Sequence, residues 1–245
     1  MSGKHNALLI DIGNSQIKYT LVNGEVPIAQ SPIRVVRCTS VIELAPIIDC
    51  CDRVLVSSVG QAEQVDTLTQ LCTVHNKPLL MVTTPTHGFG IDCAYEHYQT
   101  LGVDRWLAIL AGRRLTDKAF AVLDFGTANT CDFVLNDQHL GGWIAPGFSL
   151  MRDSVVSNTR HVFANDQFPT DLLVGKQTVD CVNMGCVAAT LGFFHAAEQQ
   201  MSTFTDNYQI IISGGGQALL NKCAPKQCIF HPNLVLCGLM NYLSN

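Results

Sequence analysis

The chain has 245 residues, of which 47% are hydrophobic and 14% charged. This composition excludes a disordered protein and predicts a large buried core. The formal net charge is −5 and the basic residues are scattered, so we expect no nucleic-acid partner. A membrane span needs about 18 consecutive apolar residues, and the sequence has no such run. The N-terminus also lacks the hydrophobic stretch of a secretory signal, so we expect a cytoplasmic protein without a membrane partner.

The eleven cysteines do not follow the pattern of a disulfide framework. Their number is odd, no two have the C-x-x-C spacing, and Cys131, Cys186 and Cys237 lie in apolar segments. A thiol in such a segment behaves as a small hydrophobic side chain. We therefore expect reduced, structural cysteines rather than a redox or metal site.

Apolar runs and turn residues predict alternating strands and helices. In chain order these are a hairpin at 7–23, strands at 53–57 and 78–83 with a helix at 61–72 between them, a helix at 104–115, a second hairpin at 120–136, a strand at 141–145 followed by a helix to 157, a long core helix at 178–201, and a strand at 208–213 that runs into three glycines. This alternation is typical of α/β domains.

The two hairpins are an internal repeat. Each has an apolar strand, then Asp-x-Gly with a polar turn, then a second strand, and Asp11 is displaced from Asp124 by 113 residues. We infer a duplicated α/β domain, with an N-terminal copy at 1–117 and a C-terminal copy at 118–245. The cleft between the copies is the expected ligand site.

The first turn has the residue types that bind a phosphate. Asp11 at a strand end can hold Mg²⁺, Gly13 lets backbone N–H groups approach a phosphate, Asn14 and Ser15 add donors, and Lys18 follows on the return strand. The alternative is an ordinary hairpin, in which Asp and Asn are common turn residues.

The repeat favours the nucleotide interpretation. Asp124-Phe-Gly126-Thr127 supplies a second carboxylate and hydroxyl turn, and Gly214-Gly215-Gly216 follows a late strand, where adenosine would be seated. Paired loops of this kind bind ATP in actin-like, Hsp70-like and sugar-kinase-like phosphotransferases. We therefore expect two duplicated ribonuclease H-like domains with an interdomain ATP cleft.

A third segment places an acidic residue directly before a basic one. Asp104 and Arg105 adjoin at a predicted helix start, where the carboxylate can accept a hydroxyl proton and the guanidinium can bind a carboxylate substrate. The alternatives are an N-cap for Asp104 and a solvated first-turn position for Arg105. The local sequence leaves both open.

Together these motifs resemble type III pantothenate kinases, from about residue 8 to the C-terminus. The resemblance rests on Asp11-x-Gly-Asn-Ser15 with Lys18, on Tyr95 with Leu101-Gly102-Val103-Asp104-Arg105-Trp106, on Asp124-Phe-Gly126-Thr127, and on Gly141-Gly-Trp-Ile-Ala-Pro146-Gly147. It implies ATP-dependent phosphorylation of pantothenate to 4′-phosphopantothenate, the first step of coenzyme A biosynthesis. It also implies a homodimer with the substrate site at the subunit interface.

The resemblance assigns roles by position. Asp104 would be the general base, and the pantothenate pocket would be lined by Tyr95, Gly102, Val103, Asp104, Arg105 and Thr178. Nucleotide contacts would come from Asp11, Ile12, Gly13, Asn14, Ser15, Gln16, Ile17, Lys18, Thr127, Gly214 and Gly215. Asp124 would bind the monovalent cation, K⁺ or NH₄⁺, that the family requires, and Asp11 would lie near Mg²⁺. Ser15, Tyr98 and Gly216 depart from the family's usual residues.

Two alternatives from other classes stay open. One is a weakly active or inactive relative with a regulatory role, because the family also resembles a transcriptional accessory protein. The other is a different enzyme of the actin-like fold, for which the Gly102-Val103-Asp104-Arg105 segment and Tyr95 would have no purpose.

Overall fold

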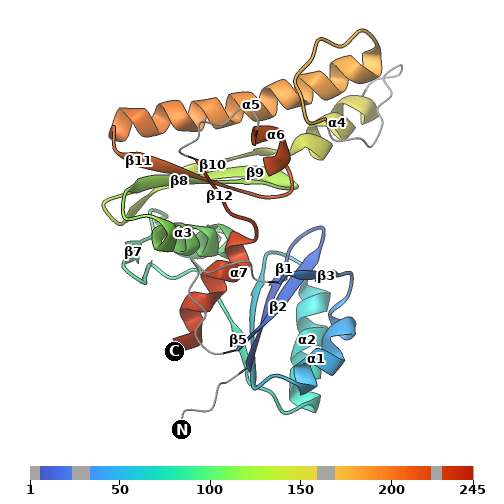
Figure 1. Ribbon diagram of the computed structural model, residues 1–245. Helices are drawn as coiled ribbons and strands as arrows, with labels where there is room; N and C mark the ends of the chain where they lie inside the picture. Colours follow the sequence, from blue (N-terminus) through green and yellow to red (C-terminus); the bar gives the residue numbers. More distant parts are fainter. Residues whose placement is uncertain (1–5, 24–33, 159–168, 222–227, 245) are drawn as a thin grey trace. The chain divides into compact units, whose positions relative to one another are not determined.

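The computed structural model describes residues 6–23, 34–158, 169–221 and 228–244, and every predicted site residue lies within these ranges. The chain forms two compact units (Figure 1). The first unit contains Met1–Asp117 together with Asn233–Asn245, and the second contains Lys118–Pro232. Residues 233–245 thus belong to the first unit, whereas the sequence predicts that they are part of a C-terminal domain at 118–245.

The first unit is built on a five-stranded sheet in the order β3-β2-β1-β4-β5. The strands are β1 (Asn6–Ile12), β2 (Ile17–Asn23), β3 (Val36–Cys38), β4 (Arg53–Ser58) and β5 (Leu79–Met81). β1, β2 and β3 form an antiparallel meander, whereas β4 pairs parallel to β1 and β5 parallel to β4. The first predicted hairpin and the strand expected at 53–57 are therefore confirmed.

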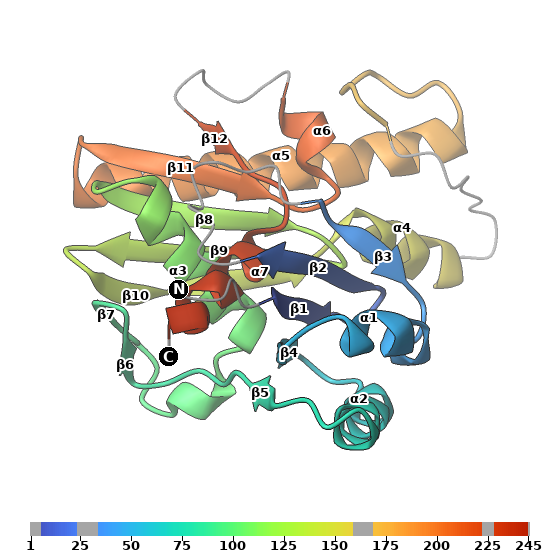
Figure 2. The same cartoon turned by 60° about the horizontal axis from the view of Figure 1, so that its bottom comes forward.

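Helices cover one face of this sheet. They are η2 (Val41–Leu44), α1 (Ala45–Asp49) and α2 (Ala62–Val74), and Figures 1 and 2 show α1 and α2 on the same side of the sheet. Alternate residues of β1 and β4, such as Ile10 and Val56, are fully buried in this layer. The residues between them face the other side of the sheet and are buried as well, so both strands are buried on both faces, as their continuous apolar runs predict.

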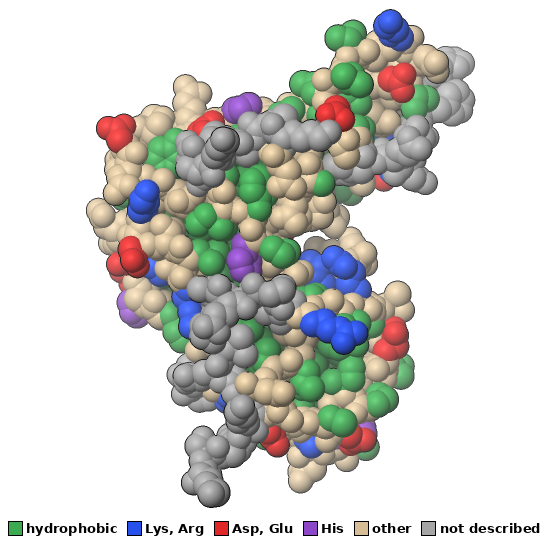
Figure 3. Space-filling view, viewed as in Figure 1, with side chains coloured by type: hydrophobic (Ala, Val, Ile, Leu, Met, Phe, Trp, Pro, Cys, Tyr) green, Lys and Arg blue, Asp and Glu red, His purple; other side chains and the backbone are tan. Residues whose placement is uncertain are grey.

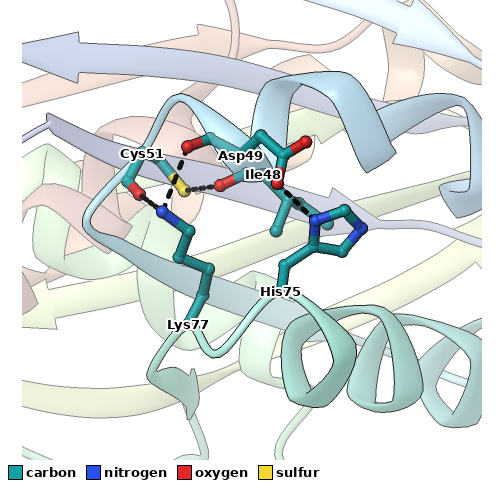
Figure 4. Close-up of polar contacts among 5 residues, drawn as sticks. All are labelled: Ile48, Asp49, Cys51, His75 and Lys77. Carbon is teal, nitrogen blue, oxygen red and sulfur yellow. Dashed lines mark hydrogen bonds and ion pairs between the residues drawn. The ribbon is translucent and has the colours of Figure 1, made fainter.

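The loop between α1 and β4 is tied to the end of α2 (Figure 4). Lys77 Nζ donates hydrogen bonds to the carbonyl oxygens of Asp49 at 3.1 Å and Cys51 at 2.7 Å. His75 Nδ1 contacts the Asp49 carboxylate, and the Cys51 thiol donates to the Ile48 carbonyl at 3.3 Å. These bonds satisfy the backbone carbonyls of the loop and fix where β4 begins.

The other face of the sheet is contacted by α3 (Val103–Leu115) and α7 (Leu234–Leu239). The two helices approach closely at Gly238, where a Cβ atom would lie 2.1 Å from the Leu107 carbonyl oxygen. Leu234, Leu236 and Leu239 are buried beside it. This packing explains why the C-terminal segment belongs to the first unit, a return that the internal repeat gives no means to detect. Short elements complete the unit: β6 (His87–Gly88), β7 (Ile91–Asp92), η3 (Tyr98–Thr100) and η4 (Met240–Ser244).

The strands of the second unit follow the order β12-β11-β8-β9-β10. They are β8 (Ala119–Phe125), β9 (Ala128–Leu135), β10 (Gln138–Pro146), β11 (Tyr208–Ser213) and β12 (Ile229–Phe230). β8, β9 and β10 are antiparallel, and β11 pairs parallel to β8 and to β12. Each unit therefore starts with a three-strand meander and adds a parallel strand to its first member, so the predicted duplication is confirmed.

The second unit has three helices, α4 (Phe148–Ser157), α5 (Thr178–Phe204) and α6 (Gln217–Leu220). α5 lies along the sheet in Figure 1, with Val187, Phe194 and Met201 fully buried against it. Within the described residues, α5 is the one helix that is long and apolar enough, by length and composition alone, to cross a membrane. Its buried stripe is that of the core helix predicted at 178–201.

The cysteines contribute to the packing. The ten cysteines in the described ranges are free, and most of them are buried. Burial raises the pKa of Cys72 and of Cys228 to about 11. A thiol with so high a pKa carries little thiolate at neutral pH and is a poor nucleophile.

Candidate active site

The first candidate site lies where the parallel strands β1 and β4 end. Asp11 and Ser57 are partners in the register, and the Ser57 hydroxyl donates to Asp11 Oδ1 at 3.1 Å. Both side chains are buried, with 7% and 1% of their surface exposed. A buried carboxylate needs hydrogen-bond donors, and Ser57 provides one.

A row of polar side chains crosses the sheet at this level. Asp11 is directly opposite Lys18 on β2, and Lys18 is directly opposite Arg37 on β3. Partners in a sheet register project to the same face, so Arg37, Lys18 and Asp11 are neighbours. Figure 3 shows Lys and Arg side chains on the part of the surface that β2 and β3 form. Two like charges opposite each other disfavour the sheet unless an anion is near.

The turn between β1 and β2 is tight and exposed. The Gly13 N–H donates to the Gln16 carbonyl at 3.1 Å, and the side chains of Asn14, Ser15 and Gln16 are exposed. Ile12 and Ile17 close the hairpin and are buried in the core. Their side chains are thus engaged in packing, which leaves their backbone for any contact with a nucleotide.

Asp104 lies in the first turn of α3 and is not its N-cap. The N-cap is Gly102, so the N-cap alternative for Asp104 is wrong. Asp104 Oδ1 accepts a hydrogen bond from the Arg105 N–H at 2.8 Å. A Cβ atom on Gly102 would lie only 2.5 Å from the same oxygen. Gly102 therefore leaves the space in which the carboxylate folds back over the start of the helix. The negative charge also suits the positive end of the helix dipole.

Arg105 is buried, with 7% of its surface exposed, so the alternative of a solvated first-turn arginine is wrong. Its Nη1 donates to the Tyr95 hydroxyl at 3.0 Å, and the guanidinium carbon lies 5.7 Å from the centre of the Tyr95 ring. This combines a hydrogen bond with a cation–π contact. The neighbouring Val103 is also buried.

The first unit also contains a pocket of about 460 Å³. Its lining includes His87, Phe89 and Tyr242, and the Tyr242 hydroxyl accepts a hydrogen bond from the buried Trp106 indole at 3.3 Å. His87 Nδ1 is 2.6 Å from Asp92 Oδ1. No predicted site residue lines this pocket.

The second Asp-x-Gly turn lies at the end of β8 in the other unit. Asp124 is the register partner of Ser213 at the end of β11. The Gly126 N–H donates to the Ala128 carbonyl at 3.1 Å, and Thr127 is exposed on the turn. The N–H of Gly147 donates to the Thr127 carbonyl at 3.0 Å. A Cβ atom at 147 would lie 2.2 Å from the Gly126 carbonyl oxygen, so only glycine fits against this turn.

The Gly-rich segment after β11 packs against the same turn. Gly214 has φ +92°, and a Cβ atom there would lie 2.4 Å from the Phe125 carbonyl oxygen. The same oxygen accepts a hydrogen bond from the Gly216 N–H at 2.9 Å. The structure therefore brings Gly214 and Gly215 next to the turn that carries Asp124 and Thr127.

The remaining predicted residue, Thr178, is exposed at the first position of α5. It belongs to the second unit, whereas Tyr95, Asp104 and Arg105 belong to the first. The predicted substrate residues are thus divided between the units.

The predicted metal ligands are two separate carboxylates, Asp11 and Asp124. In the ranges that the structure describes, no three His, Cys, Asp or Glu side chains form a group that would hold a metal ion. Asp11 and Asp124 are each the last residue but one of a strand, and each has a serine, Ser57 or Ser213, as its register partner on the parallel strand. A single carboxylate with a phosphate and waters is a common donor set for Mg²⁺ in kinases. The residues present fit that kind of site and do not fit an all-protein metal cage.

Sequence reasoning missed Ser57 and Gln61. Ser57 ends an apolar strand predicted beside the first hairpin, and the shared edge at which parallel strands end would have drawn attention to it. Gln61 donates its side-chain amide to the carbonyls of the first turn, across 48 residues to Gly13. Nothing in the local sequence indicates that contact.

The comparisons with known proteins decide the family. The profile of the type III pantothenate kinases matches residues 7–200. The chain belongs to this family. A type III pantothenate kinase of Pseudoalteromonas atlantica is 53% identical over 99% of both chains. Another, from Pseudoalteromonas translucida, is 36% identical over 96% of this chain and 94% of its own length.

Solved structures agree on the fold. A protein of Campylobacter jejuni described as a Baf family transcriptional activator superposes with a TM-score of 0.62 at 20% identity, over 97% of each chain. A protein of Sinorhizobium meliloti described as a 2-dehydro-3-deoxygalactonokinase gives 0.56 at 12% identity, over 96% of this chain and 97% of its own. The predicted fold class, an α/β architecture of two duplicated domains, is therefore confirmed.

Proposed function

We propose that this member of the pantothenate kinase family transfers the γ-phosphoryl group of ATP to the primary hydroxyl of pantothenate, with Asp104 as the general base. The product is 4′-phosphopantothenate, at the first step of coenzyme A biosynthesis. The observation that carries the assignment is the arrangement at the start of α3. There a carboxylate held by a backbone N–H adjoins a buried arginine that Tyr95 orients.

In this mechanism the hydroxyl oxygen of pantothenate forms a bond to the γ-phosphorus as the bond to the bridging oxygen of ADP breaks. The hydroxyl proton passes to the Asp104 carboxylate. An alcohol is a poor nucleophile at neutral pH, and a positioned base of this kind contributes about 10²–10⁴-fold to the rate. Asp104 is suited to the role because Gly102 and the Arg105 N–H fix the position of Oδ1.

The pantothenate carboxylate would be bound by Arg105. A guanidinium forms two parallel hydrogen bonds with a carboxylate, and Arg105 is held so that little side-chain entropy is lost on binding. Tyr95 supplies the acceptor that orients it. Gly102 and Val103 would form the adjacent wall, and Thr178 of the second unit would reach the substrate.

The residues proposed to bind ATP come from the two Asp-x-Gly turns and from the Gly-rich segment after β11. The turn Asp11–Lys18 in the first unit would bind the phosphates through backbone N–H groups and Lys18, with Arg37 adding positive charge beside it. Thr127 would bind phosphate from the second unit, and Gly214 and Gly215 would seat the adenosine. Phosphoryl transfer depends mainly on positioning and charge neutralisation, and these residue types provide both.

Cations complete the proposed site. Mg²⁺ would be held near Asp11, and a monovalent cation, K⁺ or NH₄⁺, near Asp124. When bound, they neutralise charge on the phosphates. The support from this chain is that each carboxylate ends a strand next to a turn of polar groups.

We also propose a cytoplasmic homodimer with the pantothenate site at its interface. The support is an exposed apolar segment just before Thr178. Val174 is 90% exposed and Leu173 68% exposed, while the Leu173 N–H donates to Met184 Sδ at 3.1 Å and so lies along α5. Exposed apolar clusters of this kind mark interaction surfaces.

The experiment is a coupled assay of ADP release with and without pantothenate, each in the presence and absence of K⁺. We expect turnover that requires pantothenate and rises with K⁺. Absence of pantothenate-dependent turnover under both conditions would contradict the proposal and favour the regulatory alternative.

A further inference from the structure

Gln61 lies in the connection between β4 and α2, directly before the helix. It is the N-cap residue of α2, yet its side chain makes no capping hydrogen bond to the helix. Instead, Gln61 Nε2 donates to the carbonyl oxygens of Gly13 and, at 3.2 Å, of Asn14. One amide group therefore binds two consecutive carbonyls of the candidate phosphate turn.

The geometry of the peptide unit gives this contact a consequence. In a trans peptide the C=O of one residue and the N–H of the next point in opposite directions. When Gln61 holds the carbonyls of Gly13 and Asn14, the N–H groups of Asn14 and Ser15 are therefore turned to the far side. Oriented N–H groups of this kind are what a phosphate requires.

The connection next to Gln61 supports the same contact. Gly60 has φ +143°, a conformation that favours glycine, and a Cβ atom on it would lie 3.5 Å from Asn14 Oδ1. The chain after β4 thus passes directly against the turn, and the Val59 N–H donates to the Ile12 carbonyl at 3.4 Å. The turn is held from one side by this connection.

We infer that Gln61 is a positioning residue for nucleotide binding, which fixes the Gly13–Ser15 peptides so that their N–H groups face the phosphates of ATP. The inference rests on the proposed function, because it takes the first turn as the ATP site. Gln61 itself need not touch the nucleotide. Its loss should weaken ATP binding and leave pantothenate binding alone.

The test compares Gln61→Ala and Gln61→Glu with Gln64→Ala as the matched control. Gln64 lies in the first turn of the same helix, and its side chain also ties the helix to another segment, because it accepts a hydrogen bond from the Val41 N–H at 3.0 Å. Its loss removes a comparable contact without touching the turn. The measurements are the Kd of Mg·ATP by calorimetry without pantothenate, the KM of each substrate, and the melting temperature of each variant.

We expect Gln61→Ala to raise the Kd for ATP roughly five- to tenfold, the value of about one hydrogen bond. Gln61→Glu should raise it further, because a carboxylate repels both carbonyls and the phosphates. The KM of pantothenate should stay within about twofold. A Kd in Gln61→Ala within twofold of the wild type, or an equal rise in Gln64→Ala, would overturn the inference alone. Failure of the wild type to bind ATP would overturn the proposed function with it.

Discussion

The Tyr95 hydroxyl accepts a hydrogen bond from Arg105 Nη1 at 3.0 Å, and the Tyr95 ring lies under the same guanidinium. Arg105 is also buried, so both its surroundings and the contact with Tyr95 hold its side chain in place. A long cationic side chain that is already ordered loses little entropy when it binds an anion. The pair accordingly predicts that Tyr95 acts on substrate affinity through Arg105.

Tyr95→Phe keeps the ring and the cation–π contact and removes only the hydroxyl acceptor. We expect the KM for pantothenate to rise roughly three- to tenfold, in line with the loss of one charge-assisted hydrogen bond. Steady-state kinetics with each substrate varied in turn provide the measurement. A KM for ATP that rises by the same factor would show that the hydroxyl acts on the whole site, contrary to this assignment.

Asp104→Asn should lower kcat by about 10²–10⁴-fold, the usual cost of losing a general base. The amide oxygen of Asn can still accept the hydrogen bond from the Arg105 N–H, so the start of α3 should remain intact. Turnover and melting temperature together make the test. Unchanged turnover would exclude Asp104 as the base, and a large fall in melting temperature would point to a structural role.

Gly102→Ala tests the position of the same carboxylate without changing its chemistry. The backbone of Gly102, at φ −52° and ψ 131°, is accessible to alanine, but the added Cβ would lie 2.5 Å from Asp104 Oδ1. The carboxylate must therefore move. A displacement of about 1 Å in a reacting group can cost 10²-fold in rate, so we expect kcat to fall by roughly 10- to 100-fold. Wild-type kcat in this variant would show that the carboxylate position is not critical.

The sequence predicts the repeated part of this architecture well. Hairpins that begin with an apolar run and turn at Asp-x-Gly are local features, so Asp11 and Asp124 are correctly placed at strand ends. The alternatives for Asp104 and Arg105 could not be settled from the sequence. Helix capping depends on which residue leaves the helical conformation first, and the burial of Arg105 depends on Tyr95, ten residues upstream.

Packing contacts between residues far apart in the chain could not be predicted from the sequence. The C-terminal helix α7 returns to the first unit because Gly238 allows close approach to α3, which no local pattern indicates. Gln61 reaches the first turn only because β4 and β1 are parallel neighbours. Such contacts connect residues far apart in the chain and depend on the complete fold.

Gly214→Ala should destabilise the second unit. The residue has φ +92°, which is strained for alanine, and the new Cβ would overlap the Phe125 backbone. We expect a loss of about 2 kcal/mol or more, seen as a fall in melting temperature of roughly 4–8 °C. Gly215→Ala is the matched control, because no atom lies within 4 Å of a Cβ at that position. Equal melting temperatures of the two variants would contradict the argument.

His231 should make the second unit less stable in mild acid. Burial lowers the pKa of this histidine below its usual 6.5, although the hydrogen bond that Nδ1–H donates to the Pro232 carbonyl at 2.9 Å acts in the opposite direction. The folded state thus favours the neutral imidazole. Below pH 6.5 the unfolded chain takes up a proton that the folded chain does not, so stability is lost as the pH falls from about 6.5 toward the lower folded pKa.

The comparison of wild type with His231→Asn measures this contribution. Asn keeps a donor near the position of Nδ1 but does not titrate. The urea midpoint of the His231→Asn variant should therefore fall less than that of the wild type when the pH is lowered from 7.5 to 5.5. His195→Asn serves as the control, because that histidine side chain is 60% exposed on α5. Parallel pH profiles for wild type and His231→Asn would mean that the acid sensitivity of the second unit arises from other groups.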